Sequence, residues 1–114
     1  MSAHVANEWA RGEVVRTARA LLSGELGILE ACIPLASLAH DVVADWRVDP
    51  DFVVFGAVAS ETDDLPLGKA RDQWSAAALA RADVEIDRYT REVQEQVNTP
   101  CRNVTNRFEP QQTA

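Results

Sequence analysis

Apolar residues recur in steps of three and four toward both ends of the chain, which is the spacing of one face of an α-helix. The first stripe follows Asn7, a residue suited to capping a helix, and predicts a helix that runs to about Leu22. The second stripe follows Ser75 and predicts a helix over residues 76–97. Thr99-Pro100 is expected to end that helix and to start a short turn or helix after it. The two stripes consist of Val14, Ala18, Leu21 and Leu22, and of Leu79, Ala82, Ile86, Tyr89, Val93 and Val97.

The segment from Glu25 to Asp45 has a different pattern, with apolar residues around almost its whole circumference. A helix that is apolar on all sides is typically a buried helix. This segment is therefore predicted to be the central helix of the fold. Pro34 lies inside it, removes one backbone donor and is expected to kink it.

The run 52–59 is ambiguous between helix and strand. Its valines and phenylalanines favour a strand, whereas the spacing of Phe52, Phe55 and Ala59 favours a helix. The preceding Asp49-Pro50-Asp51 combines a capping carboxylate, a proline suited to the first turn and a further acid, which is typical of a helix start. Because the sequence offers no second clear strand as a partner, helix is the preferred interpretation.

These elements together predict an all-α fold, with four to five helices packed around the central, apolar, proline-kinked helix. The alternative is an α+β fold with a short strand near residues 52–59. The chain has 114 residues, nearly half of them apolar, which suffices for one domain with its own core. We expect a single helical domain over residues 1–114, with frayed ends at about 1–6 and 109–114.

The chain is acidic, with a formal net charge of −7 and a pI of about 4.7. Nucleic acids and anionic membranes attract clustered lysine and arginine, so neither is expected as a partner. The charge is compatible with a basic protein as partner, and the alternative is that it only keeps the protein in solution. No apolar stretch approaches the roughly 20 residues that span a bilayer. The N-terminal residues lack the pattern of a secretion signal. We therefore expect a cytoplasmic protein in which Cys32 and Cys101 are reduced.

Most of the acidity lies in residues 45–64, which hold six acids and one base and carry −5 of the net charge of −7. One interpretation is a surface that binds a basic partner. The alternative is that these side chains only cap helices and keep a loop in water. The spacing lacks the alternation of acids around a glycine that marks an EF-hand loop, so no metal site is predicted. The candidate partner-binding residues are Asp49, Asp51, Glu61, Asp63 and Asp64.

The sequence contains no glycine-rich phosphate loop and no nucleophile elbow. Cys32 and His40 share a stripe of the predicted central helix, but they lie about 12 Å apart along its axis, too far for a nucleophile and its base. We therefore predict neither catalytic residues nor a cofactor. A small metal-binding protein or enzyme that uses His40, Asp41 and the acidic loop 60–64 is the alternative.

Four short strings mark the chain between about residues 18 and 102. They are the run from Ala18 to Glu25, Asp51-Phe52 with Phe55, Ser60-Glu61-Thr62-Asp63 with Leu65-Pro66, and Trp74. Together they resemble a group of small bacterial proteins that have no established activity. The resemblance implies no catalytic residue, but it draws attention to the string 60–66.

The sequence thus favours a non-enzymatic interaction domain whose acidic segment contacts a basic partner. A protein that neutralises a basic partner protein, of the immunity type, is one concrete form. A structural homodimer is a further alternative, because the apolar residues of 26–43 exceed what one small domain readily covers.

Overall fold

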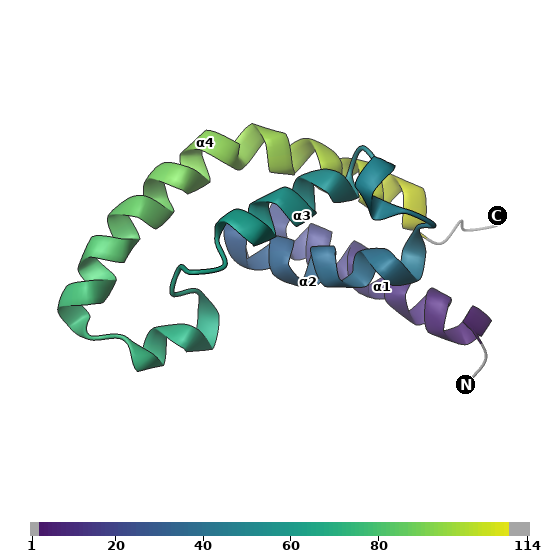
Figure 1. Ribbon diagram of the computed structural model, residues 1–114. Coiled ribbons are helices and arrows are strands. Elements are labelled where there is room, and N and C mark those ends of the chain that lie inside the picture. The colour runs from purple at the N-terminus through teal and green to yellow at the C-terminus, as the bar shows by residue number, and fades with distance from the viewer. Residues whose placement is uncertain (1–2, 110–114) are drawn as a thin grey trace.

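The computed structural model describes residues 3–109, and their side chains from residue 7 onward (Figure 1). None of the described residues lies in a strand, so the predicted all-α class is confirmed. Of the ends that are predicted to fray, residues 1–2 and 110–114 lie outside the described residues. The elements are α1 (Ala3–Leu22), α2 (Ile28–Val42), the 3-10 helix η1 (Trp46–Val48), α3 (Phe52–Glu61), the 3-10 helix η2 (Gly68–Gln73) and α4 (Ala76–Phe108).

Helix α1 buries one stripe of side chains at steps of four, four and three. The helix begins at Ala3, so Asn7 lies inside it instead of capping it. It ends at Leu22, as predicted, and Gly24 follows with a φ of 85°, a conformation that glycine adopts without strain. The buried stripe consists of Ala10, Val14, Ala18 and Leu21.

Helix α2 packs against both α1 and α3, so the central position of this segment is confirmed. Pro34 lies inside the helix, as predicted. The helix is shorter than the expected Glu25–Asp45, and one side of it faces solvent, since Ile33 keeps 47% of its surface exposed. Burial on all sides was therefore a wrong expectation. The buried side chains of α2 are Leu29, Ala31, Cys32, Leu35 and Ala39.

Helix α3 resolves the ambiguous run 52–59 in favour of a helix, and the strand alternative is wrong. Phe52, Phe55 and Val58 recur at steps of three and are buried on one side of it. The start is fixed by Asp49, whose Oδ1 accepts hydrogen bonds from the backbone N–H groups of residues 51 and 52 at 3.0 and 3.1 Å. Side-chain capping thus outweighs the strand preference of valine and phenylalanine.

Helix α4 is 33 residues long and forms one edge of the molecule (Figure 1). Ser75 caps it, accepting a hydrogen bond from the N–H of Ala78 at 3.1 Å. The break expected at Thr99-Pro100 is absent, because α4 continues through a buried Pro100 to Phe108. Packing against α1 along the C-terminal half stabilises the helix enough to accommodate the proline.

The N-terminal half of α4 extends beyond the bundle formed by α1, α2 and α3, and residues 62–75 fold back beneath it (Figure 1). We call residues 62–92 the arm. It gives the molecule extents of 52 × 30 × 27 Å and a radius of gyration of 15.2 Å, whereas a compact chain of this length has about 13 Å. Arg71 ties the arm together, since its two Nη atoms donate to the carboxylate of Asp83 at 2.7 and 3.0 Å.

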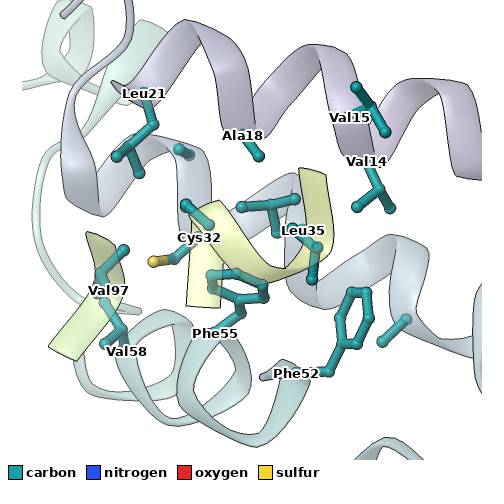
Figure 2. Close-up of a cluster of buried hydrophobic side chains, with 14 of the residues drawn as sticks. Val14, Val15, Ala18, Leu21, Cys32, Leu35, Phe52, Phe55, Val58 and Val97 are labelled. Atoms are coloured by element: carbon teal, nitrogen blue, oxygen red, sulfur yellow. The ribbon is translucent and has the colours of Figure 1, made fainter. Parts of the chain in front are cut away.

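The core lies where α1, α2, α3 and the C-terminal half of α4 meet. Figure 2 shows the side chains of α1 directed toward the two phenylalanines of α3, with Cys32 and Leu35 of α2 between them. The rings of Phe52 and Phe55 meet edge to face, with their centroids 5.6 Å apart. This core fixes the position of α3, and α3 in turn positions the acidic residues at its two ends.

Candidate functional site

The five acidic residues singled out in the sequence fall into two groups in the structure. Asp49 and Asp51 precede α3, whereas Glu61, Asp63 and Asp64 lie at its C-terminal end. Since α3 has 10 residues, the two groups are about 15 Å apart along its axis. The structure therefore does not bring the five residues into one cluster.

The first group forms ion pairs with the C-terminal end of α4. Arg107 binds Asp49 with two parallel hydrogen bonds, from Nη1 to Oδ1 at 3.0 Å and from Nη2 to Oδ2 at 2.9 Å. Nη1 also donates to Oδ2 of Asp51 at 2.8 Å, and Nδ2 of Asn103 donates to the other Asp51 oxygen at 2.9 Å. We call Asp49, Asp51, Asn103 and Arg107 the clasp, because they fasten the start of α3 to the end of α4.

The two carboxylates of the clasp are largely withdrawn from solvent, whereas Asn103 and Arg107 are exposed. The side chains of Asp49 and Asp51 are 10% and 8% exposed, and the guanidinium of Arg107 lies over the ring of Phe108 at 5.0 Å. Hydrogen bonding to Arg107 lowers the pKa of Asp49 below its ordinary value, and the same contact raises the pKa of Arg107. Both carboxylates are thus satisfied within the chain, and their role toward a partner stays a prediction.

The second group is open to solvent. Glu61, Asp63 and Asp64 are exposed, and they form no ion pair with another side chain of residues 7–109. We call these three residues the acidic turn. The buried Thr62 holds the turn in place, since its hydroxyl donates to the carbonyl of Val58 at 2.9 Å.

A groove of about 450 Å³ adjoins the acidic turn and runs between α3 and α4. Its walls are mostly apolar, and Glu61 lies at one end of it. Burial, together with hydrogen bonding to Glu61, raises the pKa of Tyr89 in the opposite wall. The lining residues are Val53, Val54, Ala57, Val58, Glu61, Tyr89, Glu92, Val93 and Gln96.

The residues of the metal-binding or enzymatic alternative do not assemble into such a site. His40 and Asp41 are exposed near the end of α2, and His40 contacts the edge of Trp46 with ring centroids 6.4 Å apart. No three His, Cys, Asp or Glu residues within the described part of the chain are placed to hold a metal ion. Burial raises the pKa of the thiols of Cys32 and Cys101 to about 12, which makes both poor nucleophiles at neutral pH.

Sequence reasoning missed Arg107 and Asn103, which complete the clasp, and Tyr89, which faces Glu61. All three belong to α4 and meet α3 only through the tertiary fold. The steps of three and four placed Tyr89 on the apolar stripe of α4, but they gave no sign that its hydroxyl meets a carboxylate.

No helix of the described chain has both the length and the apolar character needed to cross a membrane.

Comparison with known proteins gives one result. The model of a family described as a protein of unknown function, DUF2489, matches residues 5–104. Searches of curated proteins and of solved structures found no match. The resemblance to an uncharacterised group, seen in the sequence, is therefore confirmed.

Proposed function

Since the chain belongs to the DUF2489 family of unknown function, we propose from its own surface that it is a non-enzymatic domain that binds a basic protein through the acidic turn. The observation that carries this proposal is the contrast between the two acidic groups. Asp49 and Asp51 are neutralised inside the chain, whereas Glu61, Asp63 and Asp64 present three carboxylates to solvent without a cation.

Electrostatics favours this role over binding to nucleic acid. With a net charge of −7, the chain repels polyanions and attracts positively charged proteins over a distance of about 8 Å at physiological salt. An acidic protein that covers and neutralises a basic toxin is one concrete form of such a domain. The small size of the chain and its localised negative charge both support that form.

Charge reversal of the acidic turn tests the proposal. Wild-type protein and the triple variant Glu61→Lys, Asp63→Lys, Asp64→Lys are immobilised and exposed to an extract of the native host. We expect the wild type to retain a basic protein that the variant loses. The control reverses Glu25, Asp87 and Glu95, which are also exposed and lie outside the turn.

The control variant has the same net charge as the test variant, so retention by the control separates a local site from a general charge effect. Any protein retained by the wild type is identified by mass spectrometry, and its binding is measured again with both purified components. If the captured protein binds the triple variant as tightly as it binds the wild type, the acidic turn is not the binding site.

A further inference from the structure

The groove between α3 and α4 leaves apolar side chains in contact with solvent beside the acidic turn. Val53 keeps 38% of its surface exposed, and Ala57, one turn later on α3, is exposed as well. Tyr89 and Val93 face them from α4. Exposed valine and alanine side chains that line one continuous groove with a half-buried tyrosine are typical of a binding surface, whereas scattered exposed apolar residues are not.

The spacing of the groove residues matches the side chains of a third helix. Val53, Ala57 and Glu61 follow one another at steps of four along α3. The distance from the first to the last is about 12 Å, at 1.5 Å per residue, or slightly more than two helical turns. A helix that lies along this groove would place two or three apolar side chains in it, at positions i, i+3 or i+4, and i+7.

The charge around the groove selects among such helices. Glu61 and Glu92 line it, and the other two carboxylates of the acidic turn follow at the same end of α3. Glu92 already has a cation, because Arg88 donates to it and to Glu85 at 2.6 Å each. The uncompensated charge therefore lies at the Glu61 end, where the negative end of the α3 dipole adds to it. Lysine or arginine is favoured at that end of an occupant, and acidic residues are disfavoured.

We infer that the α3–α4 groove binds a basic amphipathic helix of a partner protein. Its apolar side chains pack between Val53 and Tyr89, and its lysine or arginine residues meet the acidic turn. The inference rests on the proposed function and deepens it by naming the form of the partner segment. A second copy of the chain is a poorer occupant, because its net charge of −7 is repelled by the acidic turn.

Binding of synthetic peptides tests the inference. The probe is a fluorescently labelled peptide of 14 residues with leucine at helical spacing on one side and lysine on the other. One control peptide has glutamate in place of every lysine, and a second keeps the composition but alternates leucine and lysine. Fluorescence anisotropy at low and at physiological salt measures the dissociation constant for each peptide. We expect the helical basic peptide to bind at least tenfold more tightly than either control.

Variants of the protein locate the binding site. Ala57→Trp fills the groove, and Val53→Lys adds a positive charge to its wall. Each is expected to raise the dissociation constant of the basic peptide at least tenfold. The matched control for the first is Ala80→Trp, at another exposed alanine, which lies on α4 outside the groove. Circular dichroism establishes that every variant keeps its helical content.

Three outcomes would overturn the inference. In the first, the three peptides bind equally or not at all. In the second, the basic peptide binds, charge reversal of the acidic turn weakens it, and the groove variants do not. That second result would leave the proposed function standing and place the contact outside the groove. If Ala57→Trp instead dissociates a dimer seen by analytical ultracentrifugation, a second copy occupies the groove, and the inference is also wrong.

Discussion

Replacing Arg107 with alanine should destabilise the protein by about 2–3 kcal/mol. The substitution removes two hydrogen bonds to Asp49 and one to Asp51, and it leaves two carboxylates that are nine-tenths buried without their cation. Breaking a fully buried ion pair costs about 3–5 kcal/mol, whereas an exposed pair contributes about 0.2–1 kcal/mol. The Arg107 side chain is 35% exposed, so the expected cost lies between these limits.

Urea unfolding followed by circular dichroism at 222 nm measures this cost. The midpoint should fall while the slope of the free energy of unfolding against urea stays the same, since the size of the core does not change. The melting temperature should fall by about 8–12 °C, at about 4 °C for each kcal/mol in a chain of this length. Arg91→Ala is the matched control, because Arg91 is an exposed arginine of α4 that forms no ion pair with the described side chains, and it should change stability by less than about 0.5 kcal/mol.

A double-mutant cycle separates the ion pair from other effects of the substitution. Asp49→Asn keeps an oxygen that can still accept the capping hydrogen bonds of α3, but it removes the negative charge. We expect a coupling energy of at least about 1 kcal/mol between Asp49→Asn and Arg107→Ala. Additive effects, or an Arg107→Ala variant as stable as the Arg91→Ala control, would refute the view that the clasp stabilises the fold.

Three further predictions concern the acid sensitivity, packing and thiol chemistry of the fold. The pKa of Asp49 is lower in the folded than in the unfolded chain, so the stability it provides is complete above about pH 4–5 and is lost as the pH falls through its folded pKa. Thermal unfolding between pH 2 and 6 should show this loss in the wild type and a weaker one in the Arg107→Ala variant. Gly56→Ala should destabilise by about 1–3 kcal/mol in chemical unfolding, because the added methyl group would lie 2.8 Å from the Trp46 ring. Gly12 lies in the middle of α1, and a methyl group added there meets no atom within 4 Å. Gly12→Ala should therefore stabilise the protein by about 0.5–1 kcal/mol. Equal effects at the two glycines would contradict the close contact between Gly56 and Trp46. The two buried thiols, with pKa values raised to about 12, should react with a thiol reagent at neutral pH only as fast as the chain opens, and rapid reaction of folded protein would place them outside the core.

The all-α class and the positions of the helices could be predicted because most elements carry their own local signals. Ser75 does cap α4, and the carboxylate of Asp49 does cap the start of α3. The run 52–59 shows how such a signal settles an ambiguous pattern. Its residue types favour a strand, yet the cap before it and the spacing of its phenylalanines identify the helix.

Features that depend on tertiary contacts could not be predicted from the sequence. Pro100 reads locally as a break, but burial against α1 keeps α4 continuous through it. The clasp joins residues 58 positions apart, and no periodicity connects Arg107 with Asp49.

The same limits apply to the candidate site. The clustering of acids in residues 45–64 could be seen in the sequence, but their division into a neutralised pair and an open turn could not. That division depends on where α4 ends. The groove depends on the middle of the same helix, Tyr89 to Gln96, where α4 begins to diverge from the bundle (Figure 1).

Helix α4 combines two levels of local stability in one continuous element. From residue 93 onward it buries side chains in the core and ends in the clasp, whereas none of its residues 76–92 is buried. Amide hydrogens of residues 77–88 should therefore exchange with solvent through local opening, well before those of residues 93–108, which require unfolding of the bundle. Tyr89 lies at the boundary and forms one wall of the groove. The rest of that wall, Glu92, Val93 and Gln96, lies at or beyond the boundary, so the groove keeps most of its α4 wall when residues 77–88 open.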